Sequence, residues 1–344
     1  MKKYKLAFIP VLLVIVFSCY IIADNPEILN RSPDIHEEII RKPGNLEIGK
    51  IQSRFRDSYI KIVPYTAIEE TGEIKVDVLF ESPFGSEFLA TIPINDVLRD
   101  QPALWLDDIN ILLGYKTIYN IDTKKHTNIE LPLQFFNSAD LSPNKRNIAY
   151  IGKGKDDKYS VWVYSIDTNE FHYIYTIEPE EWGNTLSPII GVSWGTDNEL
   201  YFDAPVKGKP NVFKYDADAG AVVKFREDAQ LPFGDYKGDY IAYLKGDDYI
   251  SPSEDWHTII ENIKTGETIS FPEFNKVLYG DKNISVIGRY SAVVLERYSL
   301  NKIKTMESYG EMGFPQMLND ALIFSEIIFE QGKLSSAQDR IIEP

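Results

Sequence analysis

The sequence predicts an all-β fold, a β-propeller of six blades with seven possible, after an N-terminal membrane anchor and a short stalk. One strand pattern recurs along most of the chain, as described below. Tyr (21) and Phe (18) are abundant and Met (4) is scarce, a composition that favours strands. From about Tyr59 onward, short apolar runs are broken every few residues by Gly, Asn, Asp or Pro, which is typical of strands joined by turns.

The clearest copy of the repeat is residues 141–177. A turn, an apolar strand, a polar loop, a second apolar strand, a tight turn and a third strand follow one another there. The same order recurs, complete or shortened, in 104–131, 193–227, 234–271, 279–308 and the stretch from Phe314.

The tight turns give the period of the repeat. Asp122, Asp167, Asp216 and Asn262 occupy equivalent positions at intervals of 45, 49 and 46 residues, the span of one four-stranded propeller blade. Six blades can be counted from residue 104 to the end. The strands in 59–94 form a seventh blade or supply a strand that closes the ring, and we prefer six with seven open.

Two stretches of the clearest copy carry a family resemblance. Residues 142–150 read SPNKRNIAY and residues 163–171 read VYSIDTNEF. They resemble the blades of TolB-like and related WD-like bacterial propellers, which read Ser-Pro-Asp-Gly, an apolar strand, and Asp-x-x-x-Gly. The resemblance covers about the last two thirds of the chain. It implies a propeller, and a binding or accessory role like that of most such relatives with lipoprotein-like leaders.

The first residues indicate export. Lys2, Lys3 and Lys5 precede an uncharged run, 6–23, so residues 1–23 are a signal peptide or a membrane anchor. Lysines stay on the cytoplasmic side, which places the rest of the chain on the extracytoplasmic face of the cell membrane. Residues 24–57 contain three prolines and are expected to form a stalk in which Ser32 caps one short helix. The propeller domain is then 58–344.

Two kinds of attachment remain open. Cys19 is the only cysteine and follows Val16, Phe17 and Ser18, an arrangement that resembles the lipobox of bacterial lipoproteins. In that case Cys19 is lipidated. Alternatively the 18 residues of 6–23 are an uncleaved helix, just long enough to span a bilayer. A cleaved secretory signal is a third, minor alternative.

The charge of the chain excludes one class of partner. There are 52 acidic and 36 basic residues, a net charge of −16, and no basic run follows the first five residues. Nucleic acids are bound mainly through Lys and Arg, so no nucleic-acid partner is expected.

A nucleophile motif is present in an unsuitable place. Gly191, Ser193 and Gly195 match G-x-S-x-G, which requires a strand that turns sharply into a helix. A strand follows here instead, and His257 is the only later histidine. The sequence therefore predicts a repeat turn at Ser193 and no enzyme.

A calcium loop is also unsupported. Asp216, Asp218 and Glu227 have positions one, three and twelve of such a loop, but Gly220 falls at position five instead of six. The prediction is no metal and no cofactor.

The long loops are expected on one rim of the ring. Segments 152–159, 204–211 and 245–256 join second and third strands and should share that rim with the connections between blades. Trp182 either contacts a ligand there or packs against a blade edge. The candidate binding rim is Glu180, Glu181, Trp182, Phe233 and Trp256.

The functional hypothesis is a membrane-tethered propeller that acts as a protein-interaction or ligand-binding module for an unknown protein or carbohydrate partner. One alternative is a carboxylate-based hydrolase or lyase on extracellular glycans, since converging carboxylates cannot be recognised from sequence. Another is a sensory or regulatory accessory of a membrane protein.

Replacing Cys19 with Ala distinguishes the two attachments. If Cys19 is lipidated, Cys19→Ala should abolish incorporation of radiolabelled fatty acid and block processing of the leader. An anchored chain should keep its mobility and membrane location in both forms. Absence of label from the parent protein would contradict lipidation.

Overall fold

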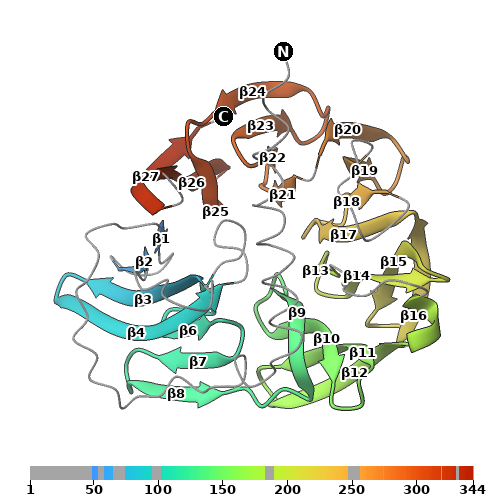
Figure 1. Cartoon of the computed structure of the whole chain (residues 1–344), viewed down its shortest axis with the longest axis horizontal. Coiled ribbons are helices and arrows are strands. Elements are labelled where there is room, and N and C mark those ends of the chain that lie inside the picture. Colours follow the sequence, from blue (N-terminus) through green and yellow to red (C-terminus); the bar gives the residue numbers. More distant parts are fainter. Residues whose placement is uncertain are drawn as a thin grey trace.

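The computed structural model describes residues 49–52, 58–64, 74–94, 102–182, 190–246, 256–273, 275–318, 320–330 and 333–343. In that part of the chain there are 27 strands in seven antiparallel sheets and one short 3-10 helix, η1 (Pro179–Trp182). Figure 1 shows the sheets arranged in sequence order around a ring. Each sheet is one blade of a propeller.

Six blades have four strands each, paired in sequence order from first to fourth. Blade 1 contains β1 (Gly49–Gln52), β2 (Tyr59–Pro64), β3 (Ile74–Ser82) and β4 (Gly85–Ile94). Blade 2 contains β5 (Ala103–Trp105), β6 (Asn110–Leu113), β7 (Thr117–Asn120) and β8 (Lys125–Asn128). Blade 3 contains β9 (Leu133–Leu141), β10 (Asn147–Gly154), β11 (Tyr159–Ser165) and β12 (Glu170–Ile177). Blade 4 contains β13 (Val192–Trp194), β14 (Glu199–Val206), β15 (Lys209–Asp216) and β16 (Ala221–Glu227).

Blade 5 contains β17 (Ala229–Gly234), β18 (Tyr240–Lys245), β19 (His257–Asn262) and β20 (Thr268–Pro272). Blade 6 contains β21 (Lys276–Tyr279), β22 (Asn283–Ile287), β23 (Ser291–Glu296) and β24 (Lys302–Glu307). Blade 7 has three strands among the described residues, β25 (Glu311–Leu318), β26 (Ala321–Glu330) and β27 (Lys333–Ile342).

The core lies between neighbouring blades. Second strands such as β22 are buried along their whole length because both of their faces are covered, and they read as unbroken apolar runs. The fourth strand β8 is exposed throughout. Between blades 5 and 6, for example, Tyr240 and Ile260 pack with Ile284 and Leu295.

The ring closes without a shared strand among the described residues. Blades 1 and 7 are separate sheets, and β1 pairs with β2 of its own blade. Ile327 of β26 is 1% exposed and packs in one apolar cluster with Ile60 and Ile62 of β2. Hydrophobic contact therefore joins the first and last blades.

The all-β propeller is confirmed, and of the two blade counts that the sequence left open the structure has seven. The strands in 59–94 make a full sheet of their own with β1 instead of completing another blade. Gly49–Gln52 of β1 falls inside the segment expected to be stalk. The leader 1–23, with Cys19, and the remainder of the expected stalk lie outside the described residues.

The contact that closes the ring can be tested by truncating Ile327. Ile327→Ala should lower the free energy of unfolding by about 2–5 kcal/mol, because it leaves a cavity between blades 1 and 7. Denaturant unfolding measures this. Ile303→Ala on β24, where the side chain is 46% exposed, is the control and should cost less than about 1 kcal/mol. Equal losses would contradict the closure.

Candidate functional site

The ring has two faces that differ in their loops. Turns between second and third strands hydrogen-bond to the connections between blades, so these segments share one face, here called the rim face. Examples are Gly208 N donating to Glu181 O (2.7 Å) and Ser308 N to Tyr290 O (2.8 Å). Turns between first and second strands and between third and fourth strands lie on the opposite face, here called the turn face.

Glu181 joins blades 3 and 4 on the rim face. It lies in η1, in the connection from β12 toward β13. Its side-chain Oε2 accepts from the Lys207 amide at 2.8 Å, and its carbonyl accepts from the Gly208 amide at 2.7 Å. Lys207 (φ 54°) and Gly208 (φ 81°) both have left-handed backbone in the tight β14–β15 turn. The connection and the turn therefore form one fixed surface, with the exposed Glu180 beside it.

Trp182 is 8% exposed and packs inside the rim face. Its ring centroid is 5.1 Å from that of Tyr159, at an interplanar angle of 60°. The residue belongs to the apolar cluster between blades 3 and 4. Of the two roles that the sequence left open for Trp182, this geometry is that of packing against a blade.

The two other rim candidates belong to blade 5. Trp256 is 8% exposed, and its carbonyl accepts from Glu273 N at 3.0 Å on the rim face. Phe233 was expected in a connection between blades, but that connection is the single residue Asp228, and β17 already begins at Ala229. Phe233 lies one residue before the end of β17, toward the turn face. The sequence Pro-Phe-Gly at 232–234 accompanies a register shift inside β17, between Gln230 and Phe233, and does not form a loop between blades.

Asp140 and Ser193 connect three first strands. The Ser193 hydroxyl donates to Asp140 Oδ2 (3.1 Å) and accepts from the Gly234 amide (3.0 Å), and the Trp194 amide donates to Asp140 Oδ2 (2.8 Å). Burial raises the pKa of Asp140 to about 6, although the Trp194 amide and the Ser193 hydroxyl stabilise its charged form. The Ser193 hydroxyl thus joins blades, and the exposed His257 lies on β19.

Sequence reasoning missed Asp140. Ser193 and Asp140 occupy equivalent positions in their blades, because each lies one residue before the end of a first strand. Trp194 ends β13 and Leu141 ends β9. An acidic residue one position before the end of a strand, inside the repeat, was the available signal.

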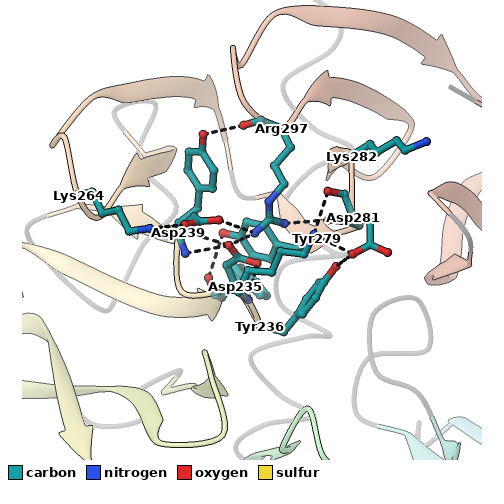
Figure 2. Close-up of polar contacts among 12 residues, drawn as sticks. Asp235, Tyr236, Asp239, Lys264, Tyr279, Asp281, Lys282 and Arg297 are labelled. Carbon is teal, nitrogen blue, oxygen red and sulfur yellow. Dashed lines mark hydrogen bonds and ion pairs between the residues drawn. The ribbon is translucent and has the colours of Figure 1, made fainter.

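A buried ion pair lies on the turn face, between blades 5 and 6 (Figure 2). Arg297 and Asp235 are both 0% exposed, and the guanidinium donates to the Asp235 carboxylate and to the Gly280 carbonyl (2.8 Å). Tyr240 Oη donates to the Arg297 carbonyl at 2.6 Å. Burial disfavours the charged guanidinium, but Asp235 outweighs that effect and holds the pKa of Arg297 above its usual value. Such a pair fixes the geometry of two blades, since loss of one partner leaves a buried charge.

Neighbouring turns are connected along the turn face. Lys237 and Asp281 form an ion pair at 2.8 Å between blades 5 and 6. Tyr236 Oη also donates to Asp281, at 2.8 Å (Figure 2). The Lys282 amide donates to Asp320 of blade 7 at 2.8 Å. On the other side of the ring, the Asn144 amide donates to Asp197 at 2.8 Å. Many polar groups of the turn face therefore bind each other.

The calcium spacing has a structural explanation. Asp216 Oδ1 accepts from the amides of Asp218 and Ala219, at 3.0 and 2.9 Å, as an Asx turn does. Asp218 accepts from Asn198, and Glu227 pairs with Lys224. Within the described ranges no group of three His, Cys, Asp or Glu side chains could hold a metal ion.

A small hollow lies beside the β3–β4 turn. It has a volume of about 280 Å³ and is lined by Ser58, Phe80, Ser82, Pro83, Phe84, Ile121 and Asp122. Asp122 is its one carboxylate. The pair of carboxylates that a glycosidase needs is not present there.

These features define a seven-bladed propeller with one face of joined turns and one of longer loops. No family model matches the chain, and no curated protein matches its sequence. The β-propeller domain of the Trilobed protease from Pyrococcus furiosus, described as having an open velcro topology, is similar in structure. The TM-score is 0.51 at 9% identity, over 86% of this chain and 97% of that one. This similarity supports the propeller fold.

Two other solved structures resemble the chain at lower scores. TolB from Acinetobacter baumannii gives a TM-score of 0.44 at 12% identity and covers 76% of this chain. This chain spans 66% of the TolB chain, slightly less than two thirds. BamB from Moraxella catarrhalis gives 0.42 at 12% identity, over 80% of each chain. Among the described residues there is no helix long and apolar enough to cross a membrane.

The raised pKa of Asp140 predicts a pH dependence. Its folded-state pKa of about 6 exceeds the ordinary value near 3.9, so the neutral acid stabilises the fold at low pH. That contribution is lost as the pH rises from about 4 through 6. The stability of the wild type minus that of Asp140→Asn should therefore fall by about 2–3 kcal/mol between pH 4 and pH 7.

Urea unfolding across this pH range gives the difference. The matched control is Asp108→Asn at an exposed turn, whose difference from the wild type should change by less than about 0.5 kcal/mol. A pH-independent difference for Asp140→Asn would disprove the assignment.

The packing of Trp182 predicts a stability loss. Trp182→Ala should cost about 3–5 kcal/mol in thermal or denaturant unfolding, because a buried ring is removed from between blades 3 and 4. Tyr173→Ala on β12, where the side chain is 53% exposed, is the control and should cost much less. An unchanged melting temperature for Trp182→Ala would contradict the packing role and favour the alternative role, contact with a ligand.

Proposed function

We propose that this chain is a non-catalytic interaction module, held at the extracytoplasmic face of the cell membrane, that binds its partner through the rim face. The tether is the N-terminal segment, through lipid on Cys19 or through an uncleaved helix within 1–23. The fold alone does not select a function, because propellers serve many. The proposal therefore rests on the residues of the rim face.

The observation that carries the proposal is the double hydrogen bond of Glu181 to the 207–208 turn. It joins a connection of blade 3 to a turn of blade 4, so the surface around η1 is already ordered without a partner. A preordered surface loses little conformational entropy on binding. Loops held on a rigid scaffold are also the usual location of binding residues.

The charges around η1 favour a positively charged partner. Glu178 is paired with Lys158 at 2.7 Å. Glu180 is exposed, and the whole chain carries a net charge of −16. The net negative charge of the chain, with Glu180 exposed at η1, attracts basic segments and repels phosphate-rich ones. A basic protein segment is the favoured partner, and a neutral carbohydrate is the alternative.

The non-catalytic role is supported by how the candidate catalytic groups are used. Ser193 and Asp140 hydrogen-bond to each other and to the amides of Gly234 and Trp194, which holds three first strands together. A hydroxyl engaged in this way is a structural group rather than a nucleophile awaiting substrate.

Charge reversal at Glu180 tests the rim face. In membranes of the native organism, Glu180→Lys should reduce cross-linking and co-purification of the partner at least tenfold, with unfolding unchanged. Asp108→Lys, an equal charge change at an exposed position on the turn face, is the matched control and should retain capture. If both variants capture equally, the rim face is not the binding surface; if both lose capture, the effect is one of net charge.

A further inference from the structure

The hollow beside the β3–β4 turn is built from three segments of the turn face. Ser58 directly precedes β2, Phe84 lies in the β3–β4 turn, and Asp122 lies in the turn between β7 and β8. The first two segments belong to blade 1 and the third belongs to blade 2, so the hollow lies where these blades meet. It is on the face of the ring opposite the rim face.

The walls of the hollow are mainly apolar and are held in place. The Phe80 ring packs edge-on against the Trp105 ring, with 6.1 Å between the centroids. Ile121 belongs to the apolar cluster that joins blades 1 and 2. The Ser82 hydroxyl accepts from the Phe84 amide at 3.2 Å, which holds the turn. Phe84 is 99% exposed, so an apolar ring on the outer wall is covered by water and would gain from contact with a ligand.

The inner end of the hollow has a buried hydroxyl. Ser58 is 4% exposed, and its Oγ has no hydrogen-bond partner among the described residues. A buried hydroxyl in this state costs free energy that a ligand group can recover by bonding to it. The Ser82 hydroxyl is instead used within its own turn. Ser58 Oγ is therefore the polar atom of the lining that a ligand would satisfy.

The outer end of the hollow is negatively charged. Asp122 is exposed there, and no Lys or Arg is among the described residues that line the hollow. Phenylalanine rings beside a carboxylate favour a cation over an anion. The net charge of −16 acts in the same direction. Charge complementarity therefore selects a cationic ligand.

We propose that this hollow binds a small organic cation with an apolar, ring-sized body, an ammonium group at one end and a hydroxyl at the other. The body lies against Phe80 and Phe84, the ammonium lies beside Asp122, and the hydroxyl bonds to Ser58 Oγ. The volume of about 280 Å³ suits such a molecule. A cavity of about 150 Å³ holds one benzene ring, and sites for larger ligands begin near about 300 Å³.

Calorimetric titration of the full chain in detergent micelles tests the proposal with three probes of similar size. Tyramine carries both end groups, phenethylamine lacks the hydroxyl, and 4-ethylphenol lacks the ammonium. The heat of each probe in protein-free micelles is subtracted. Tyramine should bind about threefold or more tighter than either truncated probe, because each of those loses one polar contact. No binding of tyramine, or equal binding of a truncated probe, would overturn the proposal.

Replacing Ser58 separates a ligand contact from a structural role. Ser58→Ala should bind tyramine and phenethylamine equally without any loss of stability, because its Oγ makes no hydrogen bond to lose. The matched control is Ser142→Ala, at a serine 1% exposed whose Oγ bonds to Asn144 and Asn147. It should lose stability and keep the preference for tyramine. If Ser58→Ala behaved like this control, the proposal would be wrong.

Two further variants test the outer end. Asp122→Asn should remove the preference for tyramine over 4-ethylphenol, whereas Asp108→Asn, at an exposed position of the same face, should keep it. Phe84→Ala should weaken tyramine binding about threefold or more and leave unfolding unchanged, because the ring is 99% exposed. An unaltered preference in Asp122→Asn, or unaltered affinity in Phe84→Ala, would contradict the assignment.

Sedimentation and a rim-face variant complete the test. Dimers that Phe84→Ala abolishes would overturn the proposal in favour of a second copy seated in the hollow. Glu180→Lys should bind tyramine as the wild type does, since Glu180 lies on the opposite face. The cation site and the proposed partner-binding rim face can therefore fail independently, and a loss of tyramine binding in Glu180→Lys would contradict the placement of the site.

Discussion

The structure depends on one constraint: a four-stranded sheet with apolar side chains on both faces must be covered on both sides. In this chain every sheet meets that requirement by packing between two others, so that second strands such as β22 are buried throughout. The last blade must then pack against the first. Contacts such as Ile327 with Ile60 and Ile62 are the result of ring closure and also what maintains it. A ring of seven therefore stabilises each blade in a way that no isolated blade could achieve.

The two faces of the ring have different roles: the turn face joins neighbouring blades, and the rim face has the longer connections. The turn face holds blades in register: Arg297 and Asp235 bury a charge pair at one boundary, and Asp281, Asp320 and Asp197 accept hydrogen bonds from the preceding blade. Loss of either partner of this pair would leave an uncompensated buried charge, so the boundary between blades 5 and 6 requires both. The rim face has the longer connections, and there Glu181 orders a surface rather than closing a core. For this reason the rim face is the proposed partner-binding surface.

Blade 7 differs from the other six blades in having three strands among the described residues. On its third strand, β27, Ile341 is 65% exposed. β27 contacts β1 of blade 1, so these two strands also take part in joining the first and last blades.

By itself the sequence determined the strands, the period and the fold class. These depend on local signals: Asp216 and Asn262 each end a third strand and accept from amides two and three residues ahead, as their spacing predicted. It did not determine the seventh blade, the burial of Trp182 or the strand position of Phe233. Each depends on which sheet packs alongside, and a register shift such as the one before Phe233 has no distinct local pattern. Arg297 and Asp235, 62 residues apart, meet only because two blades stack, and that stacking is a property of the closed ring.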